Sequence, residues 1–204
     1  MKTIKMRDIS FKEIVRLPYS KGTVIRSDFP GFKEDYLVVH SLIKKYRPKT
    51  FMEIGTSTGR GTKVICNAIG LKRFRRNKEG VKVFSIDVPP GTDSKIIYPG
   101  AEDGHPDKAG KYCRLPYTQI YGNSLDFDFS PYYPIEGWFI DGKHDYKYAK
   151  NDTGLALKSD PIIVIWHDVD IQGVGEAVVE VMSKYDNYDL FRVVGTRIAY
   201  AVRV

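Results

Sequence analysis

The chain of 204 residues is 42% hydrophobic and 28% charged, which is ordinary for a soluble globular protein and suits one domain with a sizeable core. Its net charge of +7 is spread along the chain apart from one dense basic cluster within residues 72–78, so a nucleic-acid partner is compatible with the sequence but not required by it. The composition excludes a membrane span, because no apolar run approaches about 18 residues, and two isolated cysteines without CxxC spacing exclude a disulfide scaffold.

The first 30 residues carry weak hydrophobic patterning and several prolines and glycines. We expect residues 1–30 to form an N-terminal extension or lid on a single domain that spans residues 31–204. Apolar residues recur at helical spacing over residues 32–46, and Pro48 ends that helix. Because the N-terminus lacks the apolar stretch of a signal peptide, we expect a cytoplasmic protein.

The segment from Thr50 to Thr62 predicts a strand, a tight turn and the start of a helix. Small residues at positions 55, 57 and 59 let the backbone approach a nucleotide-like ligand, and Glu53 at the strand end can accept hydrogen bonds from that ligand. A close strand-to-helix turn without any ligand is the alternative explanation.

Strands and helices alternate through the rest of the chain. The expected strands are residues 81–86, 117–121, 135–140, 162–166, 189–194 and 197–204, and the clearest helices are residues 145–158 and 174–185. Residues 88–116 have no sustained period, which is typical of a functional lid or a disordered segment. This order predicts an α/β protein with a Rossmann-like, mostly parallel sheet, helices on both faces and a C-terminal antiparallel hairpin.

Polar side chains follow almost every strand of this predicted sheet. They are Glu53, Asp87, Asn123, Asp141, His144, His167 and Asp168. In mostly parallel sheets, ligands bind outside the carboxyl ends of the strands, so we expect these side chains to share one edge. This coincidence is the strongest functional signal in the sequence.

Two of these residues have a definite chemical candidate role. Asp87 ends the second strand, where a carboxylate can accept hydrogen bonds from both hydroxyls of a ribose; an acidic turn residue before Pro89 is the alternative. His144 follows Asp141 by three residues, and a pKa near neutrality suits a general base. A histidine in the first turn of a helix is the alternative explanation there.

A metal site is a further candidate at the same edge. Asp141 and Asp168 could offer hard oxygen ligands to Mg²⁺ or another divalent cation, and His167 would better suit a transition metal. The same groups could equally hydrogen-bond to one another without a metal.

Together these residues resemble a class I S-adenosylmethionine-dependent methyltransferase. The motifs are Glu53-x-Gly55-x-Ser57-x-Gly59, Asp87, Gly122-Asn123-Ser124, Phe139-Ile140-Asp141-Gly142-x-His144-x-Tyr146 and Trp166-His167-Asp168. The nearest match is the small O-methyltransferase-like group with IDGxHxY and HD motifs, and the resemblance covers roughly residues 35–204. It implies a seven-stranded sheet with one antiparallel strand.

The resemblance also implies a cofactor and the residues that hold it. S-adenosyl-L-methionine would be bound by Glu53, Gly55, Thr56, Ser57, Gly59, Asp87, Asn123, Ser124 and Asp141. His144 and Asp141 match catalytic positions, and Asp141 and Asp168 match positions that hold a divalent cation in related catechol-type and sugar O-methyltransferases, with His167 as a further candidate ligand. Ser57 departs from the common pattern, which has a glycine there.

The implied reaction is methyl transfer to a hydroxyl oxygen of a small-molecule or sugar-like acceptor, with metal assistance as one version of it. A nucleic-acid-modifying methyltransferase is an alternative if the basic cluster lies beside the cofactor, and an NAD-dependent oxidoreductase is another. A non-catalytic relative that keeps the cofactor site is a third. The sequence does not identify the acceptor or the oligomeric state, for which a homodimer is one option.

Overall fold

The structure is a computed structural model and describes residues 5–15, 32–71, 80–92 and 108–204. In chain order its elements are β1 (Arg7–Ser10), α1 (Phe11–Ile14), α2 (Phe32–Tyr46), β2 (Thr50–Ile54), α3 (Arg60–Ile69), β3 (Lys82–Asp87), β4 (Thr118–Tyr121), the 3-10 turn η2 (Ser130–Tyr132), β5 (Gly137–Ile140), α5 (Tyr146–Lys158), β6 (Ile163–Trp166), α6 (Gln172–Met182), β7 (Tyr188–Val194) and β8 (Ala199–Arg203). None of the helices in the described ranges combines the length and the hydropathy that crossing a bilayer requires.

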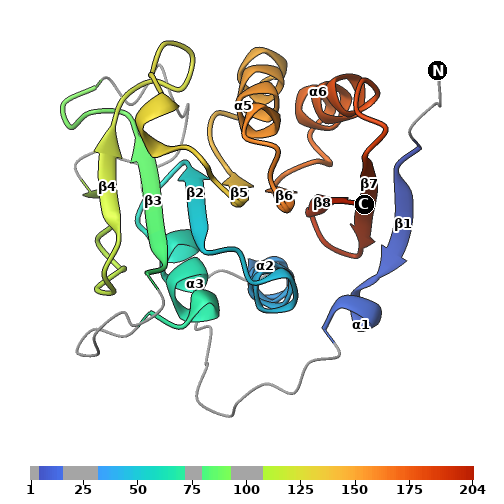
Figure 1. Cartoon of the computed structure of the whole chain (residues 1–204), viewed down its shortest axis with the longest axis horizontal. Coiled ribbons are helices and arrows are strands. Elements are labelled where there is room, and N and C mark those ends of the chain that lie inside the picture. The colour runs from blue at the N-terminus through green and yellow to red at the C-terminus, as the bar shows by residue number, and fades with distance from the viewer. Residues whose placement is uncertain (1–4, 16–31, 72–79, 93–107) are drawn as a thin grey trace.

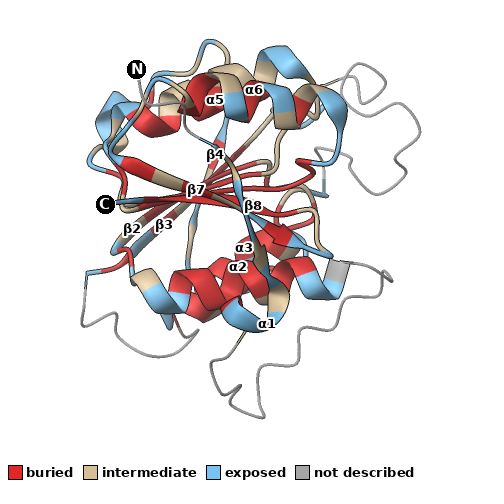
Figure 2. Ribbon diagram, turned by 90° about the vertical axis from the view of Figure 1, so that its right-hand side faces the viewer, coloured by how far each residue is buried: buried red, intermediate tan, exposed pale blue. Residues whose placement is uncertain are grey.

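In the described residues, eight strands form one sheet in the spatial order β1-β7-β8-β6-β5-β2-β3-β4. Neighbouring strands are parallel except at β8, which runs antiparallel to both β6 and β7. Helices α5 and α6 cover one face of the sheet, and α2 and α3 cover the other, which gives three layers (Figure 1, Figure 2). The α/β fold with a C-terminal antiparallel hairpin, expected from the sequence, is confirmed.

The sheet described here has one strand more than the seven that the sequence predicts, and the additional strand comes from the N-terminal extension. Strand β1 pairs in parallel with β7 at the edge of the sheet (Figure 1). Arg7 forms an ion pair with Asp189 at 2.7 Å and lies over the ring of Phe191 at 4.5 Å. Sequence analysis misses this strand because its four residues are polar or exposed in all but one position, so no apolar alternation marks it.

Some expected features fall outside the described residues. These are the basic cluster at 72–78, most of the 1–30 extension and residues 93–107 of the long loop. The end of that loop is described and packs against the turn that follows β2, where the N–H of Tyr112 donates to the carbonyl of Thr58 at 2.8 Å.

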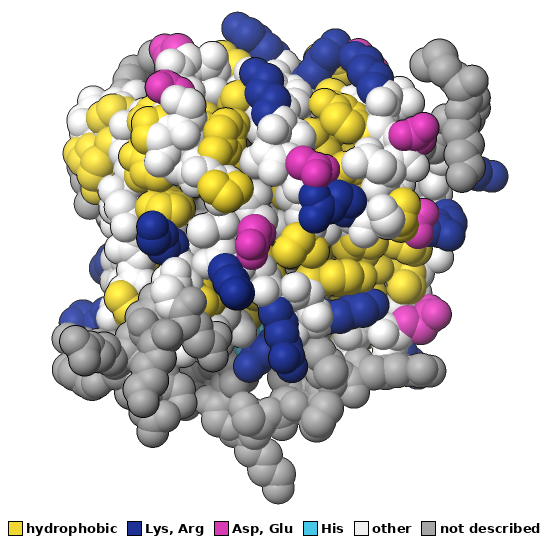
Figure 3. Space-filling model, viewed as in Figure 1, with side chains coloured by type: hydrophobic (Ala, Val, Ile, Leu, Met, Phe, Trp, Pro, Cys, Tyr) yellow, Lys and Arg dark blue, Asp and Glu magenta, His cyan; other side chains and the backbone are white. Residues whose placement is uncertain are grey.

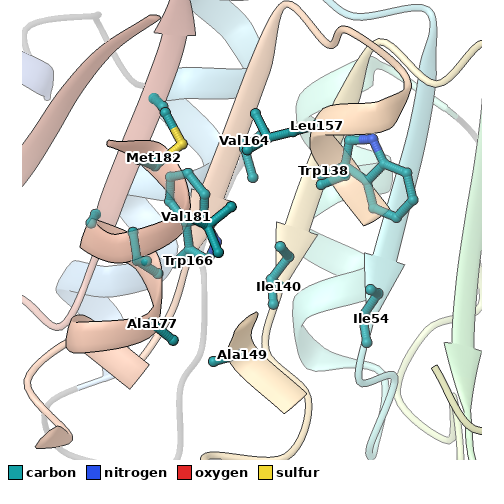
Figure 4. Close-up of a cluster of buried hydrophobic side chains, with 14 of the residues drawn as sticks. Ile54, Trp138, Ile140, Ala149, Leu157, Val164, Trp166, Ala177, Val181 and Met182 are labelled. Carbon is teal, nitrogen blue, oxygen red and sulfur yellow. The ribbon is translucent and has the colours of Figure 1, made fainter. Parts of the chain in front are cut away.

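Two apolar clusters form the core, one on each face of the sheet. Figure 4 shows the cluster under α5 and α6, which contains both tryptophans of the chain. The side chains of β5 alternate, so that Trp138 belongs to this cluster and Phe139 to the cluster on the α2–α3 face. The indole N–H of Trp138 donates to Ser159 at 2.9 Å. Truncation of a fully buried tryptophan costs about 3–5 kcal/mol, so this core holds the strands, and therefore their ends, rigidly.

The carboxyl ends of five parallel strands align in one row. The aligned residues are Ile120, Ile86, Ile54, Ile140 and Trp166. The chain continues from four of them into Asp87, Gly55, Asp141 and His167, which therefore lie along one edge of the sheet. The residues on which the sequence-based site prediction depends start from this edge.

Candidate active site

A cleft opens at this edge where the order of the strands reverses. Strand β2 lies between β3 and β5; the sheet continues through β3 to β4 on one side and through β5 to β6 on the other. Such a switch point is where open α/β sheets bind ligands. The cleft encloses about 520 Å³ of space that is open to solvent, and it is lined by Ile54, Gly55, Ile86, Asp87, Val88, Gly122, Asn123, Ser124, Gly142, Lys143 and Tyr148.

Gly55 brings the end of β2 into direct contact with the end of β5. Its φ is +96°, and a Cβ at this position would lie 2.0 Å from the carbonyl oxygen of Asp141. A larger residue would force the two strand ends apart. Ser57 also has a positive φ, +45°, and its N–H donates to the carboxylate of Asp87 at 2.6 Å. The backbone at position 57, where the common pattern has a glycine, therefore supports the carboxylate at the end of β3.

Glu53 and Thr56 lie behind the turn, and neither lines the cleft. Side chains alternate along β2, so Glu53 faces α3, where its Oε2 accepts hydrogen bonds from Thr62 and Ser85 at 2.5 Å each. The hydroxyl of Thr56 contacts that of Ser85 at 2.6 Å and accepts a hydrogen bond from Gln119 at 3.0 Å. This network ties β2, α3, β3 and β4 together beneath the turn.

The carboxyl group of Glu53 is neutral at neutral pH. Burial raises the pKa of Glu53 to about 8, although the two hydroxyl donors oppose that shift. Its Oε1 has no hydrogen-bond partner among the described residues, and a Cβ on Gly61 would lie 2.5 Å from it. Glu53 therefore acts on the cleft from below, through the turn that it supports.

The opposite wall of the cleft, Asn123 and Ser124, is held in place by α5. The side-chain amide of Asn151 donates to the carbonyl oxygen of Ser124 at 2.9 Å. Asp152 is buried and accepts hydrogen bonds from Ser124 and Asn151, while burial raises its pKa to about 6. Sequence analysis did not identify these two helix residues; the available signal was a buried carboxylate position within the predicted helix 145–158.

Two histidines and two aspartates meet at the ends of β5 and β6, next to the cleft. Nδ1 of His167 lies 3.2 Å from Oδ1 of Asp141 and 3.0 Å from Oδ2 of Asp168. Nε2 of His144 approaches the same two oxygens, at 3.4 Å and 3.2 Å. The His144 side chain is 32% exposed, whereas that of His167 is 1% exposed. The structure thus brings together the four residues proposed from the sequence for catalysis and metal binding.

Opposite charges set the protonation states in this His–Asp cluster. Burial disfavours a charged imidazole, but the neighbouring carboxylates outweigh it and raise the pKa of His144 and, strongly, that of His167. Burial also disfavours a carboxylate, yet the two histidines hold the pKa of Asp141 below its usual range. Without a metal the cluster therefore favours ion pairs between its imidazoles and its carboxylates.

Asp35 and Arg197 complete the cluster, and sequence analysis missed both. Oδ2 of the buried Asp35 lies 3.2 Å from Nε2 of His167 and accepts a hydrogen bond from the guanidinium of Arg197 at 2.9 Å. Arg197 also binds Oδ1 of Asp168 at 2.9 Å. Burial opposes the ionisation of Asp35, but hydrogen bonds from His167 and Arg197 lower its pKa. A carboxylate on the apolar face of the predicted helix 32–46 was the available signal.

The residues present fit a divalent cation. Ligand atoms of Asp141, His167 and Asp168 all lie within 4.8 Å of one another. The other ring nitrogen of His167 is held by Asp35, which is the carboxylate–histidine arrangement that orients histidine ligands in metal sites. An imidazole among the ligands favours ions such as Zn²⁺ or Mn²⁺ over Mg²⁺. Because the same groups pair with each other, a cation would compete with protons for this site.

No protein-family model matches the sequence, and no curated protein matches it either. The fold, in contrast, is similar to that of several solved methyltransferases. The O-methyltransferase from Bacillus cereus in complex with S-adenosylhomocysteine (SAH) aligns with a TM-score of 0.59 at 16% identity, over 95% of this chain and 90% of that chain. The O-methyltransferase TomG from Streptomyces achromogenes, in complex with S-adenosylmethionine, gives 0.59 at 15% identity, over 95% and 86%.

The SAH-bound methyltransferase PaMTH1 from Podospora anserina aligns with a TM-score of 0.55 at 12% identity, over 100% of this chain and 91% of that chain. At identities this low the similarity is one of fold. The Rossmann-like fold expected from the sequence, which these solved methyltransferases share, is therefore confirmed.

Proposed function

We propose that this protein, whose fold is that of class I methyltransferases, transfers a methyl group from S-adenosyl-L-methionine to a hydroxyl oxygen of a small molecule. The observation that carries the proposal is the contact between the cleft and the His–Asp cluster, since Gly55 of the cleft lies against the backbone of Asp141 of the cluster. A ligand that fills the cleft would end beside two carboxylates and two imidazoles. Those groups suit proton removal from an acceptor hydroxyl.

The cleft offers contacts to each part of the cofactor. The two oxygens of Asp87 accept the N–H groups of Ser57 and Val88, and each oxygen keeps a second lone pair for a ribose hydroxyl. Asn123 and Ser124 would lie beside the adenine, and the backbone at Gly55 beside the methionine part. When bound, the cofactor supplies an electrophilic methyl group.

The His–Asp cluster would act on the acceptor. In its unprotonated form His144 would take the proton of the acceptor hydroxyl at Nδ1, because it is the more exposed of the two histidines and its Nε2 is buried against two carboxylates. Asp141 and Asp168, at 3.4 Å and 3.2 Å from Nε2, would stabilise the imidazolium that forms. His167 is buried and fixed by Asp35, so it would orient the carboxylates. A divalent cation held by Asp141, His167 and Asp168 would lower the pKa of the hydroxyl.

Calorimetric titration with SAH, and separately with NAD, tests the cofactor assignment. We expect the wild-type protein to bind SAH and not NAD. Asp87→Ala should weaken SAH binding by about tenfold or more, because two hydrogen bonds to a charged acceptor are lost. Asp186→Ala, which removes an exposed carboxylate that does not line the cleft, is the matched control and should have no effect. Binding of NAD in place of SAH would contradict the proposal and favour an oxidoreductase.

Turnover with a panel of catechols and sugars tests the proposed chemistry. On any acceptor that is methylated, His144→Ala should lower kcat by about 10²–10⁴, the usual contribution of a general base, and leave SAH affinity unchanged. Asp141→Ala should lower kcat as well. Normal turnover in both variants would show that the His–Asp cluster is not the catalytic site.

A further inference from the structure

A second cleft lies beside α3 and shares no lining residue with the cofactor cleft. It runs between α3 and residues 111–115 and encloses about 760 Å³ of space that is open to solvent. We call it the basic cleft, because its described lining residues include three cations and no acidic residue. They are Lys63, Asn67, Lys111, Tyr112, Arg114 and Leu115.

The wall formed by residues 111–115 is fixed in place by contacts on both sides. The N–H of Tyr112 donates to the carbonyl of Thr58 in the glycine turn at 2.8 Å. Cys113 is buried in the apolar cluster that contains Cys66 of α3, and the thiol of Cys66 donates to the carbonyl of Pro116, just after this wall, at 4.0 Å. Lys111 and Arg114, which flank these anchored residues, therefore lie at a defined distance from α3.

Among the described residues, the cations of the basic cleft have no acidic partner. In the part of the chain that the structure describes, Lys63, Lys111 and Arg114 form no ion pair, whereas Lys150 on the surface of α5 binds Glu180 of α6 at 2.7 Å. Figure 3 shows that Lys and Arg side chains also gather in the lower middle of the face drawn there, near α2. Like charges held together without counter-charges attract anions, so this arrangement favours an anionic ligand.

The ring of Tyr112 holds a further cation, Arg60, at the edge of the cleft. Tyr112 is 42% exposed, and the guanidinium of Arg60 and the ammonium of Lys111 lie 5.0 Å and 5.4 Å from its ring centroid. Both distances are within the range of cation–π attraction, which holds the two head groups near the cleft. Asn67, one turn after Lys63 on α3, contributes an amide donor. The cleft thus combines several positive charges with hydrogen-bond donors from two separate elements.

We propose that the basic cleft binds phosphate groups of a ligand, either a free di- or triphosphate or the backbone of a nucleic-acid strand. Phosphate oxygens match what the cleft offers, because a guanidinium can bind two of them side by side and lysines attract them as point charges. Several cations from two elements suit more than one phosphate at a time. The site is distinct from the proposed methyl-transfer site and does not depend on that assignment.

Binding of two probes to the purified protein tests the proposal. The probes are tripolyphosphate, followed by calorimetry, and a fluorescent single-stranded oligonucleotide of about 12 nucleotides, followed by anisotropy from about 50 to about 200 mM salt. The test variant is Lys63→Gln/Lys111→Gln. The control is Lys44→Gln/Lys45→Gln, which removes the same charge from exposed positions of α2 and also breaks one lysine–tyrosine contact, that of Lys45 with Tyr46 at 5.1 Å.

We expect the wild-type and control proteins to bind at least one probe, and the Lys63→Gln/Lys111→Gln protein to bind it about tenfold more weakly. For the oligonucleotide, loss of two phosphate contacts should also reduce the salt slope of log K by roughly 1.4. Tight binding of the oligonucleotide alone would assign the cleft to a strand, and equal competition by tripolyphosphate would assign it to a free phosphate compound.

The proposal is overturned if neither probe binds, or if the test and control variants bind equally well. Arg114→Gln is a second variant, so the result does not depend on one altered protein, and thermal melting verifies that each variant is folded. SAH binding is measured separately in each variant. A protein that binds phosphate but not SAH would contradict the proposed methyl transfer and leave the phosphate proposal intact. A protein that binds SAH but no phosphate probe would contradict the phosphate proposal and leave the methyl-transfer proposal intact.

Discussion

Two carboxyl groups at the strand ends, those of Glu53 and Asp141, reach opposite charge states although desolvation disfavours the charged form of both. Behind the glycine turn, Glu53 has two hydroxyl donors and forms no ion pair with any described residue, and burial raises its pKa to about 8. In the His–Asp cluster, Asp141 also faces desolvation, but His144 and His167 keep its pKa low. Burial acts in the same direction on both carboxyl groups, so the neighbouring charges decide the outcome. The partners of a carboxyl group at a strand end therefore decide whether it stays neutral within a hydrogen-bond network or is ionised and available to a ligand.

Removal of Asp35 should disrupt the His–Asp cluster, the charged member of this comparison, and should have the largest effect on stability of the changes considered. Asp35→Ala leaves His167 and Arg197 without their shared buried carboxylate, and loss of one partner from a buried ion pair typically costs about 3–5 kcal/mol. Urea denaturation measures this free energy of unfolding. Glu34→Ala, at the exposed neighbouring position, is the control and should change it by less than about 0.5 kcal/mol. Equal stability of the two variants would mean that Asp35 is not part of an ion-pair network.

Glu53→Gln tests whether the carboxyl group of Glu53 is neutral in the folded protein, through the pH dependence of stability. The unfolded chain loses the Glu53 proton near its ordinary pKa of 4.5, while the folded protein keeps it until about pH 8. Because folding then requires uptake of a proton, the contribution of Glu53 to stability falls as pH rises between these values and is constant above them. Relative to the wild type, Glu53→Gln should therefore gain on the order of 3 kcal/mol between about pH 5 and about pH 8.

Urea denaturation of both proteins at several pH values measures this difference, in which the histidines that both proteins share cancel. SAH affinity at neutral pH serves as the control and should be unchanged, since Glu53 does not line the cleft. Parallel stability curves over this range would show that Glu53 is ionised in the folded protein.

Metal binding tests the charge state of the His–Asp cluster, and the expected effect is smaller. A cation must displace the proton of His167, whose pKa is raised, so Mn²⁺ affinity should rise with pH, by about tenfold per pH unit as long as His167 is protonated in the free protein. Electron paramagnetic resonance of free Mn²⁺ measures this affinity. Asp168→Asn should weaken binding by more than about tenfold, whereas the exposed Asp170→Asn should not. Affinity that is independent of pH, or equal in both variants, would exclude Asp168 and His167 as ligands.

Periodicity predicted the fold well, because apolar runs and glycine turns are local signals. The helix at residues 32–46 and the polar residues that follow β3, β5 and β6 lie where the sequence places them. The same alternation also explains Glu53: in β2, Phe51 packs on the α2–α3 face, so Glu53 two residues later faces α3 as well. Applying the period of two to that strand would have predicted its burial.

Contacts between distant segments could not be predicted in this way. Asp35 meets His167 across 132 positions of sequence and Arg197 across 162. No local pattern marks such a pairing. It forms only when α2 packs on the sheet and the turn between β7 and β8, which carries Arg197, contacts α2. The basic cleft is similar, since α3 and residues 111–115 are joined only through folded contacts.

The smallest predicted effect links the two clefts through the glycine turn. Gly110 donates to the carbonyl of Ser57 at 2.9 Å, and the N–H of Ser57 donates to Asp87 at 2.6 Å, so the wall of the basic cleft and the proposed ribose carboxylate share one turn. Tripolyphosphate bound to this wall should raise SAH affinity by about threefold, and SAH should raise tripolyphosphate affinity equally. Calorimetry at constant ionic strength measures both directions. The effect should vanish in Lys63→Gln/Lys111→Gln, and an unchanged SAH affinity with bound tripolyphosphate would show that the turn transmits nothing between the two clefts.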